Sequence, residues 1–234
     1  MDSRIELVVA RYKEDTAWVQ TLGYPAVVYD KSGNPAANPL PNVGRETHTY
    51  LYHLVARYPQ FADYTVFLQG DPFAHLAARA DHPEGGPAAL KAMIDEAVAR
   101  RMPFKGFAYY TLKCDALGRP HDLNAAHNAG KWPGYGRDIP VGELYSRLFA
   151  GPVPERYHAR GAAACFLVRR DRILARAKGV YAAALELVLA DPDDAFNTGH
   201  AFERLWSILF NGYDALNRPE HGEPAGAGAA RRRG

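Results

Sequence analysis

Residues 64–75, YTVFLQGDPFAH, decide how this chain is expected to fold. The first six residues are rich in apolar side chains, and such a run predicts a buried β-strand. The strand ends on Gln69, after which Gly70, Asp71 and Pro72 interrupt it and His75 follows. In α/β proteins ligands usually bind beyond the ends of such strands. The stretch therefore predicts both a strand of the sheet and a candidate site.

Segments on both sides of this strand alternate between strand and helix patterns. Further strands are predicted at 5–10, 25–30, 105–112 and 162–168. Helices are predicted at 16–19, 46–58, 87–101, 141–149, 171–190 and 200–210. This order predicts a single Rossmann-like α/β domain over residues 1–212, with a largely parallel sheet and helices on both faces.

The helix predicted at 46–58 illustrates the periodicity behind these assignments. Leu51, Leu54 and Val55 recur at helical spacing and form one apolar stripe. His48 and His53 lie away from that stripe, so both are expected to be exposed.

Composition excludes several classes of protein. The chain has 234 residues, of which 47% are hydrophobic and 23% are charged, as in ordinary globular domains. The net charge is only +2, and three of the basic residues are the consecutive arginines 231–233. A near-neutral body of this kind is not expected to have nucleic acid as its main partner.

The expected compartment is the cytoplasm. Cys114 and Cys165 are far apart and form no CxxC pattern, which fits a reducing environment. No apolar run approaches the roughly 18 residues that a membrane span requires, and charged residues near Met1 leave no signal-peptide core. Residues 213–234 are rich in Pro, Gly, Ala and Arg and are predicted to form a disordered tail.

Polar residues follow the first three predicted strands. They are Arg11, Tyr12, Glu14 and Asp15 after the first, Asp30 and Lys31 after the second, and Gln69 and Asp71 after the third. Any one of them is more often a solvated turn residue. Their coincidence at successive strand ends favours a binding site there.

The helix at 46–58 begins with a pattern suited to an anion. Free N–H groups and the positive end of the helix dipole attract phosphate or carboxylate, and Arg45 would add a bidentate donor. Asn42 and Gly44 lie just before it. The alternative is that Asn42 or Gly44 merely caps the helix.

Asp71 is the candidate ligand for a divalent metal, since hard cations take oxygen ligands. His75 would complete the site for manganese or zinc. Pro72 restricts the backbone after the strand and would direct Asp71 outward. The alternative is an aspartate that accepts backbone hydrogen bonds in a turn.

Other candidate residues lie farther along the chain. Glu203, on the last predicted helix, would serve as a general base if it faced the cleft, or would form a salt bridge with a neighbouring arginine. His158 and Arg160 precede a buried strand and are candidate substrate contacts, as is Gln69. The irregular segment 115–139 contains further histidines.

Five segments together resemble the bacterial and fungal family known as domain of unknown function 3431. They are VVARYKEDTAWV, PNVGRETHTYLYHLVARY, DYTVFLQGDPFAH, GAAACFLVRRDRIL and FERLWSILF. More distantly, the layout is similar to glycosyltransferases of the GT-A type. That resemblance implies Tyr12 and Glu14 near a nucleotide, Asp71 at a manganese or magnesium ion, and Glu203 as base. The chain departs from it in supplying one carboxylate where the GT-A metal motif has two.

The sequence therefore favours a glycosyltransferase that uses a nucleotide-activated sugar and an unknown acceptor, with Mn²⁺ or Mg²⁺ assisting. One alternative is a non-catalytic sugar- or nucleotide-binding protein on a transferase scaffold. Another is a metal-dependent hydrolase that uses Asp71, His75 and a histidine from the 121–127 segment.

Overall fold

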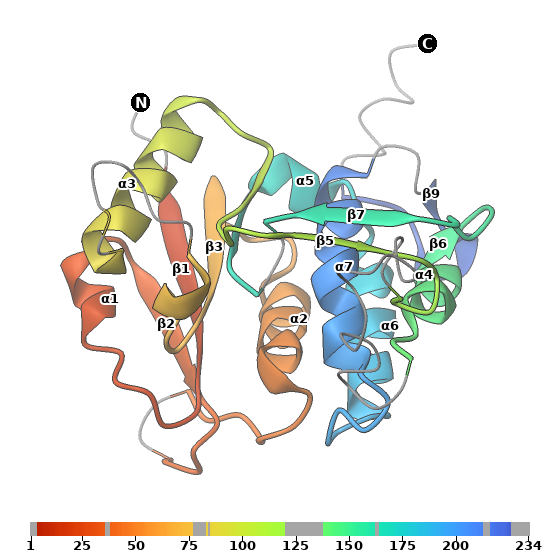
Figure 1. Ribbon diagram of the computed structural model, residues 1–234, viewed down its shortest axis with the longest axis horizontal. Coiled ribbons are helices and arrows are strands. Elements are labelled where there is room, and N and C mark those ends of the chain that lie inside the picture. The colour runs from red at the N-terminus through yellow and green to blue at the C-terminus, as the bar shows by residue number, and fades with distance from the viewer. Residues whose placement is uncertain are drawn as a thin grey trace, which may run out of the picture.

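The computed structural model describes residues 4–35, 38–76, 83, 85–119, 138–161, 164–212 and 216–225 (Figure 1). The main strands are β1 (Ile5–Arg11), β2 (Ala26–Asp30), β3 (Tyr64–Gln69), β4 (Phe104–Gly106) and β8 (Phe166–Arg169). The helices are α1 (Trp18–Thr21), α2 (Arg45–Arg57), α3 (Gly86–Ala99), α4 (Val141–Leu148), α5 (Arg170–Leu174), α6 (Lys178–Leu189) and α7 (Thr198–Asn211). None of these helices combines the length and apolar character needed to cross a membrane.

The five main strands form one mixed sheet in the order β2-β1-β3-β8-β4. Strand β1 pairs in parallel with β2 on one side and with β3 on the other. Strand β8 runs antiparallel to both β3 and β4. The α/β class is confirmed, but the sheet is not as parallel as expected. An apolar run indicates that a strand is buried on both faces. It does not indicate whether that strand runs parallel or antiparallel to its neighbours.

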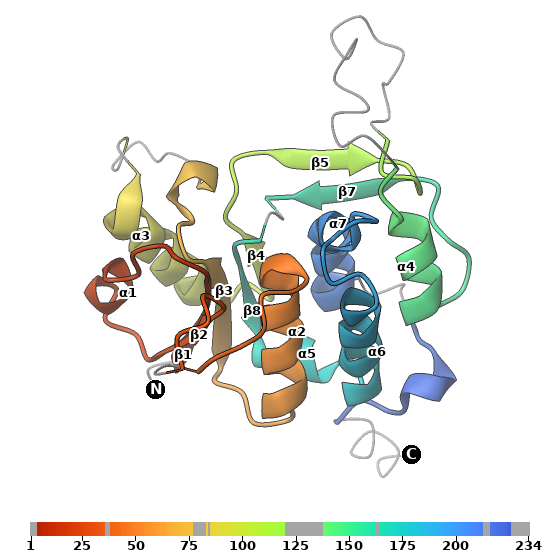
Figure 2. The ribbon, with the colours of Figure 1, turned by 90° about the horizontal axis from the view of Figure 1, so that it is seen from below.

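Helices cover both faces of the sheet, as predicted. Because alternate side chains of a strand point to opposite faces, Leu7 and Val9 pack with the apolar side of α3, while Val8 packs with α2. Figure 2 shows α1 and α3 on one side of β1–β3 and α2, α6 and α7 on the other. The predicted inward residues of α7, Phe202, Leu205, Trp206 and Leu209, are all buried.

The expectation that His48 and His53 are exposed is wrong. Their side chains are 4% and 0% exposed, respectively. Helix α2 lies between the sheet and helices α6 and α7 (Figure 2), so more than one of its faces is covered. The apolar stripe seen in the sequence identifies one buried face of the helix and gives no sign of a second.

The strand predicted at 105–112 is broken in the structure. Its first part is β4, while β5 (Thr111–Cys114) pairs antiparallel with β7 (Tyr157–Arg160) in a separate two-stranded ribbon beside α7. Gly161, directly after β7, allows the ribbon to lie close to the end of β4. Its φ is +64°, and a Cβ atom there would lie 2.8 Å from the carbonyl oxygen of Gly106. The spacing of apolar residues does not indicate where two backbones approach this closely, so the break in the predicted strand was not expected.

The chain remains structured beyond the predicted domain boundary at residue 212. Strand β9 (Leu216–Asn217) pairs with β6 (Phe149–Ala150), and a short 3₁₀ turn follows at Pro219–His221. The amide of Ala225 donates a hydrogen bond to the hydroxyl of Tyr58 at 3.0 Å. The rest of the predicted tail, 226–234, lies outside the described residues.

Candidate functional site

A polar pocket of about 340 Å³ opens at the carboxyl ends of β1 and β3 and at the start of α2. Its lining consists of Ala10, Arg11, Tyr12, Glu14, Lys31, Asn42, Arg45, Glu46, Gln69, Gly70 and Asp71. The chain thus brings together eight residues named from the sequence: Arg11, Tyr12, Glu14, Lys31, Asn42, Arg45, Gln69 and Asp71. We call this the strand-end pocket.

One wall of the pocket is tied together by an ion pair between neighbouring strands. Arg11 and Asp30 are opposite each other in the β1–β2 register, and their side chains form a salt bridge. Burial would raise the pKa of Asp30, but hydrogen bonds from Ser32 and the charge of Arg11 outweigh it and lower that pKa. Arg11 also donates from Nε to the carbonyl oxygen of Glu14 at 2.9 Å. Arg11 is therefore largely committed to the scaffold.

The loop after β1 is fastened to the loop after β3. The Glu14 carboxylate accepts hydrogen bonds from the amides of Tyr12 at 2.7 Å and Lys13 at 3.1 Å. It also lies so close to Gly70 that a Cβ there would be 2.6 Å from Glu14 Oε2. Trp18 Nε1 donates to the carbonyl oxygen of Gly70 at 2.9 Å. Glu14 therefore shapes the pocket wall, whereas the Tyr12 ring is 40% exposed at the rim.

Lys31, one of the polar residues that the sequence places at a strand end, is a buried cation in the pocket lining. Its side chain donates hydrogen bonds to the carbonyl oxygens of Val43, at 2.6 Å, and Arg45. Burial lowers the pKa of Lys31 from 10.5 to about 8, while the charge of Glu46 opposes that shift. The only sequence signal was its position directly after β2. Its burial comes from the loop at 42–45 folding over it.

Gly44 does not present a free amide to an anion, contrary to the prediction. Its N–H donates to the carbonyl oxygen of Pro192 at 2.7 Å. The residue has φ +57°, and a Cβ would lie 2.1 Å from Cγ1 of Val188 on α6. Gly44 is the N-cap of α2, and no side-chain hydrogen bond caps the helix within the described chain. A helix start without a side-chain cap can offer its first-turn amides to another acceptor.

Arg45 and Asn42 fit the predicted anion site better. Asn42 is exposed in the pocket lining. The Arg45 guanidinium is 46% exposed and only loosely paired, 4.0 Å from Glu46 and 3.9 Å from Asp194. It can therefore turn toward an anion without breaking a short hydrogen bond.

Two carboxylates lie behind these cations. Glu46 lines the pocket, its side chain is 10% exposed, and its buried Oε1 has no hydrogen-bond partner in the described structure. Glu203 does not line the pocket, and it forms the alternative predicted for it, an ion pair with Arg204 at 3.2 Å. Burial raises the pKa of Glu203, Arg204 lowers it, and the charge of Glu46 raises it further, with a net upward shift.

Of the two predicted metal ligands, Asp71 lines the strand-end pocket and His75 does not. Asp71 is exposed at the rim, and the amide of Phe73 approaches its Oδ1 at 3.4 Å, the turn geometry weighed as its alternative. His75 lies on the 3₁₀ turn Phe73–His75, outside the pocket lining, and its ring is 6.5 Å from that of Tyr110. Across the described residues, no three His, Cys, Asp or Glu side chains are grouped to hold a metal ion.

The remaining candidates divide between the pocket and the ribbon. Gln69 lines the pocket, whereas His158 and Arg160 are exposed residues of β7 and do not reach it. Alternation on β7 buries Tyr157 and Ala159 instead. The histidines of the 121–127 segment lie outside the described residues.

Comparison with known proteins identifies a family without a described activity. The model of a family described as "Protein of unknown function (DUF3431)" matches residues 7–224. No curated protein and no solved structure gives a significant match.

Proposed function

The chain belongs to the DUF3431 family, and we propose that it is a glycosyltransferase whose strand-end pocket binds a nucleotide-activated sugar on a GT-A-like scaffold. The observation that carries the proposal is the meeting of two cations and two carboxylates at one helix start. Lys31 and Arg45 flank the first turn of α2, and Glu46 and Glu203 lie next to them. Transfer of a sugar from a diphosphate needs both kinds of group.

The cations would hold the leaving diphosphate. Negative charge grows on the phosphate oxygens as the sugar departs, and positive groups that are already in position stabilise it without reorganisation. Lys31 is held in place by two backbone carbonyls. Arg45 offers a planar donor pair, and the start of α2 adds the positive end of the helix dipole. The exposed Tyr12 ring at the rim would lie against the nucleotide base.

The carboxylates would activate the acceptor. The acceptor hydroxyl gives its proton to a carboxylate oxygen, its oxygen bonds to the anomeric carbon, and the bond from that carbon to the diphosphate oxygen breaks. The nucleoside diphosphate leaves with the electron pair. Glu46 is the better placed base because its partnerless Oε1 belongs to a pocket residue. Glu203 is a second carboxylate nearby, and burial raises its pKa.

A divalent cation fits the described residues poorly as a group held by the protein itself. Asp71 supplies one exposed carboxylate, and Glu14 already accepts two backbone amides. Mg²⁺ and Mn²⁺ sites in transferring enzymes often use one or two carboxylates together with substrate phosphates, so Asp71 would contribute a ligand only alongside a bound diphosphate. The steps above are therefore assigned to Lys31, Arg45, Glu46 and Glu203 alone.

Calorimetric titration with uridine and guanosine diphosphates tests the proposal. Each is titrated into the full chain with manganese and then with a chelator. We expect saturable binding, weakened at least about tenfold, or about 1.4 kcal/mol, in Arg45→Gln. The matched control is Arg100→Gln at the C-terminal cap of α3, an exposed arginine that forms an ion pair with Glu96. Absence of binding in both conditions would contradict the nucleotide site.

The same titration addresses Asp71. Binding that requires manganese and is lost in Asp71→Asn would assign Asp71 to a phosphate-bridged cation. In that case Asp71→Asn should also slow turnover at least about a hundredfold, equivalent to about 2.7 kcal/mol of barrier. An unchanged turnover rate removes Asp71 from the mechanism.

A second candidate function is binding without catalysis. The observation that favours it is the single exposed carboxylate at the expected metal motif. It predicts nucleotide binding with no release of nucleoside diphosphate from any donor sugar in the presence of acceptors, so steady product release contradicts it. The hydrolase alternative needs a bound transition metal, and elemental analysis of the purified chain would detect one.

A further inference from the structure

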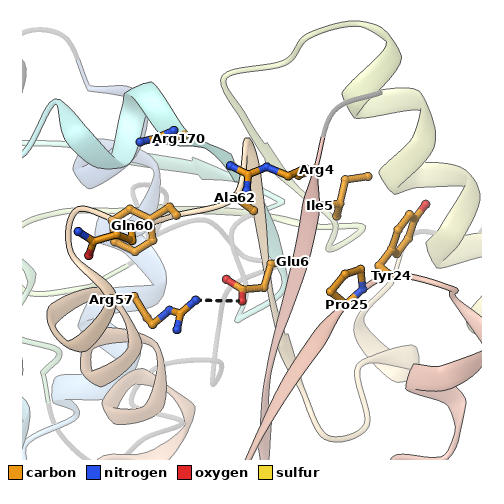
Figure 3. Close-up of a pocket in the computed structure, with 10 residues that line it drawn as sticks. Arg4, Ile5, Glu6, Tyr24, Pro25, Arg57, Gln60, Ala62 and Arg170 are labelled. Atoms are coloured by element: carbon orange, nitrogen blue, oxygen red, sulfur yellow. Dashed lines mark ion pairs between the residues drawn. The ribbon is translucent and has the colours of Figure 1, made fainter. Parts of the chain in front are cut away.

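A second and larger pocket opens at the opposite end of the same strands. It has a volume of about 640 Å³. Its residues come from the start of β1 (Arg4, Ile5, Glu6), the residues before β2 (Tyr24, Pro25), the end of α2 and the loop before β3 (Arg57, Gln60, Phe61, Ala62), and α5 (Arg170). Figure 3 shows Glu6, Arg57 and Gln60 on one side of β1, Ile5, Tyr24 and Pro25 on the other, and Arg4 at the start of the strand. We call this second pocket the amino-end pocket.

The charged groups of the amino-end pocket are mainly arginines. The lining contains three arginines, Arg4, Arg57 and Arg170, and one carboxylate, Glu6. The pocket therefore carries an excess of positive charge. Arg57 is 3.9 Å from Glu6, as the dashed line in Figure 3 marks. Within the described part of the chain, the guanidinium groups of Arg4 and Arg170 have no hydrogen-bond or ion-pair partner, although Asp63 accepts from the backbone amides at both positions.

A buried group that adds no charge lies near the Glu6 carboxylate without a hydrogen bond to it. Glu6 Oε2 lies 3.6 Å from Nε2 of His53, a side chain with no exposed surface. Burial, with Arg57 acting in the same direction, lowers the pKa of His53 to about 3, so the imidazole is neutral at physiological pH. Its Nδ1 lies 3.1 Å from the hydroxyl of Tyr29. The arginines are thus the dominant charges that a ligand would meet.

The walls of the amino-end pocket are apolar. Ile5, Pro25, Phe61 and Ala62 contribute hydrocarbon surface. The hydroxyl of Tyr24 is already engaged by Asp95 and Lys91, so its ring is the part left to line the pocket. Apolar walls with a few convergent charged groups are typical of small-molecule sites. A free phosphate ion would use the arginines but leave these walls in water.

From this combination we propose that the amino-end pocket binds a small organic anion, with a carboxylate or phosphate group carried on an aromatic or aliphatic body. The anionic group lies between Arg4 and Arg170, where bidentate pairing is available. The apolar body lies against Tyr24, Pro25 and Phe61. The site is separate from the strand-end pocket, since the two have no lining residue in common.

Matched probes test the proposal on the full chain. Phenyl phosphate and phenylpropionate carry the two anionic groups, and phenylpropanol is the neutral counterpart. Binding is followed by nuclear magnetic resonance of the isotope-labelled protein. We expect both anions to bind at least about tenfold more tightly than the alcohol, the size of effect a charge-assisted contact supplies. The amide signals of Ile5, Glu6 and Ala62 should shift, while that of Gly70 should not.

Arginine variants locate the anion. The double variant Arg4→Gln/Arg170→Gln should weaken both anionic probes at least about tenfold and leave the alcohol unchanged. Both positions are exposed, so the fold should persist, and Arg100→Gln serves as the matched control. Equal binding of anions and alcohol, an unaffected double variant, or shifts confined to the strand-end pocket would each overturn the proposal. Which anion binds more tightly distinguishes a carboxylate from a phosphate ligand.

Titration with uridine diphosphate keeps this inference distinct from the proposed function. The double variant should bind uridine diphosphate as the unmodified chain does, because no nucleotide contact is assigned to Arg4 or Arg170. Loss of probe binding with retained nucleotide binding supports a second site. Loss of both in the double variant would contradict it.

Discussion

The ammonium group of Lys31 donates a hydrogen bond to the carbonyl oxygen of Val43 at 2.6 Å. The residue that follows β2 thereby holds the loop that begins α2, although twelve positions separate the two in the sequence. A cation is fixed beside the helix start, where the dipole and free amides also favour an anion. This contact makes Lys31 both a structural tie and the best placed charge for a diphosphate.

Nucleotide affinity should fall as the pH rises through about 8. Lys31, whose pKa is about 8, is charged below that value and neutral above it. A buried neutral amine no longer attracts phosphate. Uridine diphosphate should bind roughly tenfold more weakly at about pH 9 than at about pH 7.5, as measured by calorimetry in the presence of a chelator.

Lys31→Arg is the matched variant, because an arginine keeps its charge throughout this range. Its nucleotide affinity should be nearly constant between those two pH values. A pH profile in Lys31→Arg identical to that of the unmodified chain would assign the titration to another group. Thermal unfolding of the variant checks that the loop before α2 is still held.

Replacing the two carboxylates should separate binding from turnover. Glu46→Gln removes the proposed base, so the rate of transfer should fall by about a hundredfold or more, while diphosphate binding is retained or tightened because a nearby negative charge is lost. Glu203→Gln should slow transfer less, since Glu203 does not line the pocket. Steady-state kinetics with a donor and acceptor pair measure both. The reverse order of effects would exchange their roles.

Acid should destabilise the fold before the surface carboxylates are fully protonated. Burial lowers the pKa of His53 to about 3 and that of His48 to about 4, whereas an unfolded histidine titrates near 6.5. Between these values the unfolded chain binds more protons, so stability is lost as the pH falls below about 6.5. Each histidine should cost about 2–3 kcal/mol between about pH 7 and about pH 4.5.

Urea unfolding of His53→Phe at both pH values measures that cost. The variant loses the contact with Tyr29 and should be less stable at neutral pH. On acidification it should lose less free energy of unfolding than the unmodified chain, and the difference should equal the contribution of one histidine. If the variant and the unmodified chain lose equal stability between the two pH values, His53 is not a source of the acid sensitivity.

Gly44 should be intolerant of a side chain. Its φ of +57° strains any other residue, and a Cβ would lie 2.1 Å from Cγ1 of Val188. Gly44→Ala should therefore destabilise the chain by about 2–4 kcal/mol, the sum of backbone strain and overpacking. Chemical denaturation gives the value. The double variant Gly44→Ala/Val188→Ala relieves the clash but not the strain, so it should be less destabilised than additivity of the two single variants predicts.

Local patterns were sufficient for most elements of this chain. The apolar run 64–69 is β3 to the residue, and helical spacing placed α2, α3 and α7 within one or two residues of their observed ends. The polar strand ends were also visible in the sequence, and six of those residues do line one pocket. These features depend on neighbours along the chain, whose spacing the sequence displays directly.

Contacts between distant segments were decided only by the tertiary structure. The direction of β8, the burial of His48, the packing of His53 against Tyr29 and Phe67, and the hydrogen bond from the Gly44 amide to Pro192 all depend on which elements pack together. The same holds for Lys31, which became a buried cation because the loop at 42–45 folds over it, and for Glu203, which pairs with Arg204 and does not line the pocket. By itself the sequence determined which residues stand at strand ends, because periodicity is local. Which of them meet, and with what charge, was decided by burial and by partners far along the chain.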